Sequence, residues 1–176
     1  IVITILFTYR GWFNFDFIAV GDWRAWDIDS MKEWFNIFPA WENNEYGGFF
    51  TIEAVNLIRY PIKFLYGGLA HLGLPFNISE RILNYFLFLI LAPVGIYKLT
   101  YYLFKNKFAS HIAIICFILN NYIFHYCYIG HISSMIIPYA LIPWIFLYFI
   151  KLIEKDDYLK NSLILTTLYL SLIHIS

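Results

Sequence analysis

The 176-residue sequence has few charged side chains and no net charge. Only 14% of its residues are charged, with 12 Lys and Arg against 12 Asp and Glu, whereas about a quarter is usual for a soluble domain. A balance of zero offers no electrostatic attraction to phosphates and argues against a nucleic-acid-binding protein. With 61% hydrophobic residues and a mean hydropathy of +0.64, the composition also disfavours a soluble enzyme or a disordered chain. It fits an integral membrane protein.

Motifs of common soluble enzymes are missing as well. The sequence has no glycine-rich phosphate loop, no Ser-His-Asp order and no zinc-ligand spacing. Its two cysteines, Cys116 and Cys127, are about 16 Å apart along one helix and cannot pair. No carboxylate occurs between Glu80 and Glu154.

The stretch without carboxylates divides into three apolar runs, 82–104, 108–129 and 132–150. Each is long enough to cross a bilayer, which takes about 20 residues. Because a chain in hydrocarbon must satisfy its own backbone hydrogen bonds, we expect helices. Two shorter apolar stretches, 1–9 and 161–176, are expected to be truncated transmembrane helices of a larger protein. The predicted fold class is all-α, a polytopic transmembrane helical bundle that is a fragment of a larger fold.

The lysines predict how the bundle is oriented. Two turns on one side carry them, namely Lys98, Lys105 and Lys107 at the first and Lys151, Lys155 and Lys160 at the second. The positive-inside rule places both turns in the cytoplasm. The segment 10–81, with nine acids and six bases, is then a long extracytoplasmic loop of a multi-pass plasma-membrane protein.

Residues 50–72 are apolar but contain three charged side chains and Pro61. Charges inside a span are costly, so we expect an amphipathic helix in the outer interface rather than a fourth complete span. The helix is predicted to break near Pro61 and to end at Gly67-Gly68. If the segment spans instead, the acidic residues before it fall in the cytoplasm.

Residues 10–50 concentrate five of the six tryptophans and seven acids. Most of the tryptophans fit an aromatic belt at the membrane interface. Ser30 and Glu33 have the spacing of a capping box, which predicts Ser30 as N-cap of a helix from residue 31 to about 38. The aspartates before it would then lie on an irregular loop.

Asp22 and Asp27 are candidate general bases, because Trp23 and Trp26 lie beside them in the sequence. A carboxylate against an apolar surface has a raised pKa, which suits a base that takes a proton from an acceptor hydroxyl during glycosyl transfer. Aromatic rings are also suitable platforms for sugar faces. The same acids could hold a divalent cation, although no histidine or spaced carboxylate pattern indicates one.

A series of short motifs runs through the chain from about residue 21 to 150. They are Leu69-Ala70-His71-Leu72-Gly73-Leu74-Pro75, Arg81, Gly95-Ile96-Tyr97-Lys98-Leu99, Gly130-His131-Ile132-Ser133-Ser134 and Pro138-Tyr139-Ala140-Leu141-Ile142-Pro143-Trp144. In this order and spacing the chain resembles the GT-C class of membrane glycosyltransferases. Within that class it is most similar to the N-terminal GT-C domain of the α-(1→3)-arabinofuranosyltransferases.

The resemblance implies transfer of a sugar from a polyprenyl-phosphate-linked donor to a glycan or lipid-linked acceptor outside the cytoplasm. The base in that class is an acid of the first external loop, which here is Asp22 or Asp27. A guanidinium suits the donor phosphate. The substrate-binding candidates are therefore Arg24 and Arg81, with Trp23, Trp26, His71 and His131 beside them. The partners expected are membrane lipid, the lipid-linked sugar and a glycan, with no nucleic acid.

A lipid or glycolipid transporter, or a non-catalytic polytopic membrane protein, is the alternative. In a transporter, Asn120, Asn121 and His125 would line the pathway, because polar groups inside a membrane usually face a cavity or another helix. This alternative predicts that substitutions at those three positions abolish transport, whereas the loop acids tolerate neutralisation.

Overall fold

The computed structural model describes residues 2–14, 27–35, 54–123, 136–154 and 157–175. Every regular element in these ranges is a helix, which confirms the all-α expectation for the described part of the chain. Two helices, Phe76–Phe104 and Ile136–Ile153, are long and apolar enough to cross a membrane.

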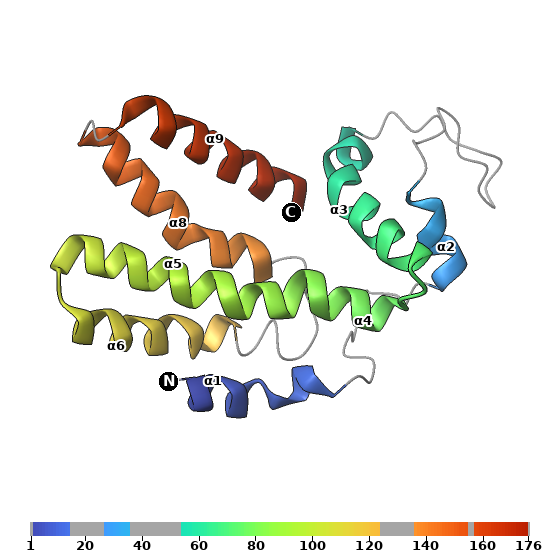
Figure 1. The fold of residues 1–176 in the computed structure, drawn as a ribbon, viewed down its shortest axis with the longest axis horizontal. Helices are drawn as coiled ribbons and strands as arrows, with labels where there is room; N and C mark the ends of the chain where they lie inside the picture. The colour runs from blue at the N-terminus through green and yellow to red at the C-terminus, as the bar shows by residue number, and fades with distance from the viewer. Residues whose placement is uncertain (1, 15–26, 36–53, 124–135, 155–156, 176) are drawn as a thin grey trace.

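The helices pack side by side with their turns at one end (Figure 1). The central α5 (Leu87–Phe104) packs against α6 (Lys107–Ile118) and α8 (Ile136–Ile153), and α8 packs against α9 (Tyr158–Ile175). Both the α5–α6 turn and the α8–α9 turn lie at the end far from α2 and α3. Lys105 and Lys107 at the first turn, and Lys151 and Lys160 beside the second, therefore lie at the same end.

The longest helix extends beyond the predicted span 82–104. It joins α4 (Phe76–Glu80), a π-helical segment η2 (Arg81–Phe86) and α5 into 29 continuous residues. That length is about 43 Å at 1.5 Å per residue, against about 30 Å for a hydrocarbon core. About 20 residues counted back from Phe104 fill such a core and reach Tyr85. The first turns, with Glu80 and Arg81, would project beyond it.

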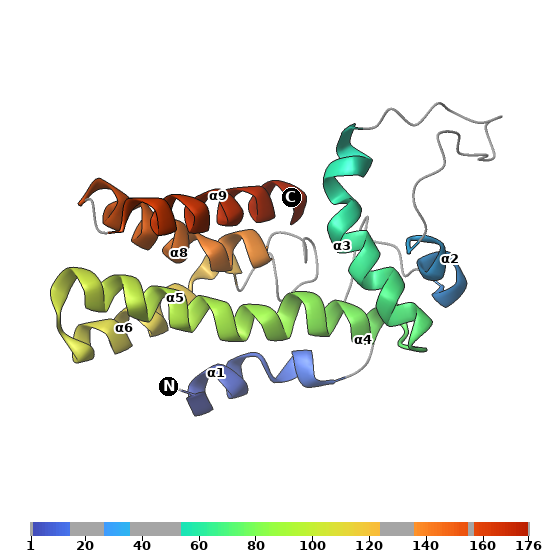
Figure 2. The ribbon, with the colours of Figure 1, turned by 45° about the horizontal axis from the view of Figure 1, so that its top comes forward.

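The helix α3 (Ala54–His71) crosses the others steeply at the opposite end (Figure 2). It packs against α2 (Ile28–Glu33), α4 and α9. The predicted break near Pro61 and end at Gly67-Gly68 are wrong, because a single helix continues to His71. Gly67 instead allows a close approach: a Cβ there would stand 2.6 Å from the backbone nitrogen of Phe35.

The helix α3 ends in a Schellman motif. Gly73 has φ +81°, and the backbone N–H groups of Gly73 and Leu74 donate to the carbonyls of Ala70 and Leu69 at 2.9 and 3.0 Å. Glycine suits this left-handed position because it has no Cβ. Pro75 then precedes α4 with an extended backbone. The motif Leu69–Pro75 thus forms the corner between α3 and the long helix.

An aromatic cluster joins the N-terminal segment to the helical bundle. Trp12, in the 3₁₀ turn η1 (Arg10–Phe13) after α1 (Val2–Thr8), is 1% exposed and stacks on Tyr9 at 4.2 Å between ring centroids. It also contacts the Tyr85 and Phe88 rings of the long helix. Trp12 is therefore a core residue and an exception to the interfacial belt expected for most of the tryptophans.

The helices α5 and α8 approach closely at Gly95. A Cβ at this position would lie 2.5 Å from Nε1 of Trp144, so only a hydrogen fits there. The indole N–H of Trp144 donates to the carbonyl of Leu91 at 2.9 Å, and the ammonium of Lys98 lies 4.8 Å from the indole centroid. Residues of two separate motifs, 95–99 and 138–144, therefore pack together in one helix–helix contact.

Candidate functional site

The loop residues fall partly within the described chain. Asp27 begins α2, His71 ends α3 and Arg81 begins η2. The other candidates, Asp22, Trp23, Arg24, Trp26 and His131, lie outside the described residues. Of the sequence-predicted site, the structure therefore places Asp27, His71 and Arg81, and their roles remain predictions.

Asp27 is the N-cap of α2, a position that we assigned to Ser30. Its carboxylate accepts from the backbone N–H groups of Asp29 and Ser30 at 3.1 and 2.9 Å, and from the Ser30 hydroxyl at 2.6 Å. The helix starts earlier than predicted because Ile28 and Met31 share a face that packs on α3. Ser30 therefore donates hydrogen bonds to the N-cap residue, Asp27, and is not the N-cap itself.

These hydrogen bonds set the charge behaviour of Asp27. The hydroxyl and backbone N–H of Ser30 lower the pKa of the Asp27 carboxyl below its usual 3.8, and the side chain is exposed. The expectation of a pKa raised by apolar surroundings is therefore wrong for Asp27. A carboxylate stabilised in this way is a weaker base.

Arg81 is fully buried and binds the backbone of the N-terminal segment. Its Nε donates to the carbonyl of Trp12 at 3.1 Å, one terminal nitrogen donates to Asn77 at 2.7 Å, and the other donates to Asn14. We expected this guanidinium to hold a donor phosphate. In the structure it fixes residues 12–14, where the loop begins, to the start of the long helix.

A group of polar side chains beside Arg81, namely Glu80, Asn84 and Tyr66, was not predicted from the sequence. Glu80 is fully buried, and Asn84 donates to the hydroxyl of Tyr66 on α3 at 3.0 Å. Burial raises the pKa of Tyr66, and the neighbouring Glu80 raises it further. The signal in the sequence was a Glu-Arg pair with an asparagine four residues after the acid, at the start of an apolar run.

His71 and Trp34 both contact aromatic rings of the α2–α3 pair. His71 is exposed, with its ring edge-on to Phe35 at 5.2 Å, and Trp34 packs edge-on to Tyr66 at 6.2 Å. Lys63 places its ammonium 5.8 Å from the Trp34 centroid. Aromatic and cationic side chains are thus gathered along the contact between α2 and α3.

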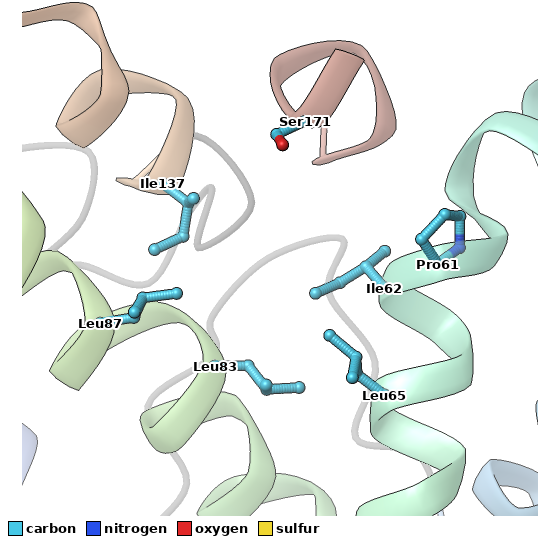
Figure 3. Close-up of a pocket in the computed structure, with 7 residues that line it drawn as sticks. All are labelled: Pro61, Ile62, Leu65, Leu83, Leu87, Ile137 and Ser171. Atoms are coloured by element: carbon cyan, nitrogen blue, oxygen red, sulfur yellow. The ribbon is translucent and has the colours of Figure 1, made fainter. Parts of the chain in front are cut away.

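An apolar cavity of about 230 Å³ lies on the inner side of α3 (Figure 3). Its lining comes from four parts of the chain: Pro61, Ile62 and Leu65 of α3, Leu83 and Leu87 of the long helix, Ile137 of α8 and Ser171 of α9. The volume is somewhat below the range of about 300–1,000 Å³ for pockets that enclose a whole small molecule. The cavity suits one segment of an apolar chain.

Asn120 has a local structural role. Its side chain accepts from the backbone N–H of Tyr122 at 2.8 Å and caps a short helical turn after α6. Asn120 and Asn121 are exposed, and His125 lies outside the described residues. Within the described ranges no three His, Cys, Asp or Glu side chains gather as a metal site, so a cation on the loop acids stays a prediction.

Comparison with protein-family models, curated proteins and solved structures found no match. The function must therefore be argued from the residues and their geometry.

We predict that Arg81→Met destabilises the fold by about 3 kcal/mol or more, because three backbone carbonyls lose the charged donor that the buried guanidinium provides. Thermal unfolding in detergent micelles, followed by tryptophan fluorescence, measures the effect. Arg10→Met is the matched control, because Arg10 is exposed and stacks on Phe7 at 4.7 Å. Equal effects of the two substitutions would contradict the proposed role of Arg81 as an internal anchor.

We predict that Asp27 titrates below 3.8 and that Ser30→Ala moves its midpoint up towards that value. Since the folded pKa is depressed, the stabilisation by the cap is present above the unfolded pKa and is lost as pH falls through the folded pKa. A carbon-13 NMR titration of the carboxyl group in micelles measures both midpoints. A midpoint above 3.8 in the wild-type protein would show that Asp27 does not cap α2.

Proposed function

We propose that this protein is a multi-pass membrane glycosyltransferase of the GT-C type. It would move a sugar from a polyprenyl-phosphate donor to a glycan or lipid-linked acceptor on the side of the loop 10–81. Two features of the arrangement support this: the lysine turns lie at one end of the helices, and α2 and α3 lie at the other. That is the separation expected when one end faces the cytoplasm and the loop faces outwards.

The observation that carries the proposal is the apolar cavity beneath α3. Leu83, Leu87 and Ile137, which belong to the two candidate spans, form its inner wall, while α3 closes the loop side. An apolar chain seated there would start at the level of the loop and continue between the helices. This arrangement favours a lipid-linked substrate over a water-soluble one.

The chemistry would occur on the loop side of the cavity. A loop carboxylate takes the proton of the acceptor hydroxyl while the bond between the anomeric carbon and the donor phosphate breaks. The acceptor oxygen bonds to the anomeric carbon, and polyprenyl phosphate leaves. Asp22 is the favoured base, because Asp27 is already engaged in capping α2 and has a lowered pKa.

We predict that Asp22→Asn lowers sugar transfer by about 100-fold or more, the contribution typical of a general base. Asp27→Asn, which can still accept hydrogen bonds at the N-cap, is expected to retain most of the activity. Membranes with matched amounts of inserted full-length protein are assayed with a labelled polyprenyl-phosphate sugar. Full activity in both variants would contradict a loop aspartate as the base, whereas no transfer by the wild-type protein from any donor would sink the enzyme proposal and favour the transporter.

We also predict that Ser171→Leu, which fills the cavity, raises the KM for a long-chain donor at least about fivefold. Thr167→Leu is the matched control, since both hydroxyls donate to the carbonyl four residues earlier, at 2.8 and 2.9 Å. Thr167 is exposed and does not line the cavity. Transfer from a donor with a short lipid should not change in either variant. An equal KM effect in both would exclude the cavity as the seat of the lipid.

A further inference from the structure

The end of the molecule opposite α3 brings lysines from two turns to one tyrosine. Tyr102 lies in the last turns of α5, and the ammonium of Lys105, in the α5–α6 turn, is 4.6 Å from its ring centroid. The ammonium of Lys151, near the end of α8, is 5.3 Å from the same centroid. Lys151 also lies 5.7 Å from the Tyr148 ring. All these distances are within the range of cation–π contacts.

The backbone of the α5–α6 turn fixes Lys105 in this place. Lys105 has φ +52°, and its N–H donates to the carbonyl of Tyr101 at 2.9 Å. Asn106 then caps α6 by accepting from the N–H groups of Phe108 and Ala109 at 2.9 and 3.2 Å. Hydrogen bonds therefore hold the backbone of both turn residues, Lys105 and Asn106, and give Lys105 a defined backbone position.

A carboxylate beside this group, Glu154, is already engaged with tyrosine. Glu154, just after α8, accepts a hydrogen bond from the hydroxyl of Tyr102. Neither Lys105 nor Lys151 forms an ion pair with a carboxylate in the ranges that the structure describes. Two ammonium groups beside one ring attract an anion, which would balance their positive charge.

The surroundings indicate where such an anion would come from. Leu103, Phe104 and Phe108, at the same turn, are 49%, 67% and 73% exposed. Exposed apolar side chains of this size beside a group of lysines fit the boundary between the acyl chains and the headgroups of a leaflet. A phosphate at this level is attached to a lipid, with its acyl chains beside the three apolar side chains.

We propose that Lys105 and Lys151, held by Tyr102, bind the phosphate of an anionic phospholipid in the leaflet at this end of the molecule. The site depends on the helices crossing a membrane and is independent of sugar transfer. Lys107 and Lys160, at the same end, are exposed and contact no ring in the described chain. They provide a matched pair with the same change in charge.

The test uses the full chain in nanodiscs of phosphatidylcholine alone, or of phosphatidylcholine and phosphatidylglycerol in equal parts. Native mass spectrometry counts the retained lipids. We expect the wild-type protein to retain phosphatidylglycerol, and Lys105→Gln/Lys151→Gln to weaken this preference about tenfold or more. Lys107→Gln/Lys160→Gln should keep most of the preference, and Lys105→Arg/Lys151→Arg should keep it as well.

Three results would overturn the proposal. One is that the wild-type protein shows no preference for the anionic lipid; this result does not depend on the folding of any variant. Another is an equal loss in the two glutamine pairs, which would indicate diffuse surface charge. The third is displacement of the lipid by millimolar glycerol phosphate in water, which would indicate a site for free phosphate. Melting temperatures in phosphatidylcholine discs check that each variant is folded.

Discussion

The buried guanidinium of Arg81 holds together the parts on which the candidate site depends. Its hydrogen bonds tie the backbone of Trp12 and Asn14 to the long helix, and through Asn77 to α4. Three residues further on, Asn84 ties the same helix to Tyr66 of α3. A buried charge is tolerated only when its donors are satisfied, and here three carbonyls, two from the N-terminal segment and one from α4, satisfy them. The start of the loop and the amphipathic helix are therefore both positioned from one turn of the long helix.

Hydrophobic runs and lysine positions predicted the all-α class and the placement of the turns, because both depend on composition over many residues. Local details could not be predicted as well. Ser30 and Asp27 are both good capping residues, and only the packing of Ile28 and Met31 on α3 decides between them. Similarly, glycine commonly ends a helix, but at Gly67 it allows the backbone of Phe35 to approach. These choices depend on contacts between segments far apart in the sequence.

The motifs behind the resemblance to GT-C enzymes have structural roles wherever the structure describes them. Leu69–Pro75 forms the Schellman corner before the long helix. Gly95 and Trp144 form a close helix contact, and Arg81 anchors backbone. Motifs with such roles serve helix packing, which many functions can use. Sugar transfer would therefore depend on the loop acids and on the cavity beneath α3.

The length of the long helix links the cavity to that chemistry. If the last 20 or so residues of Phe76–Phe104 fill the hydrocarbon core, Tyr85 marks its outer boundary. Leu83 and Leu87 of the cavity then lie at that boundary, and Glu80, Arg81 and the start of the loop lie just outside it. A lipid chain entering the cavity would leave its polar end near the level of Arg81 and the start of the loop. The same helix thus sets the depth of the apolar cavity and, through Arg81, anchors the start of the loop that carries the candidate base.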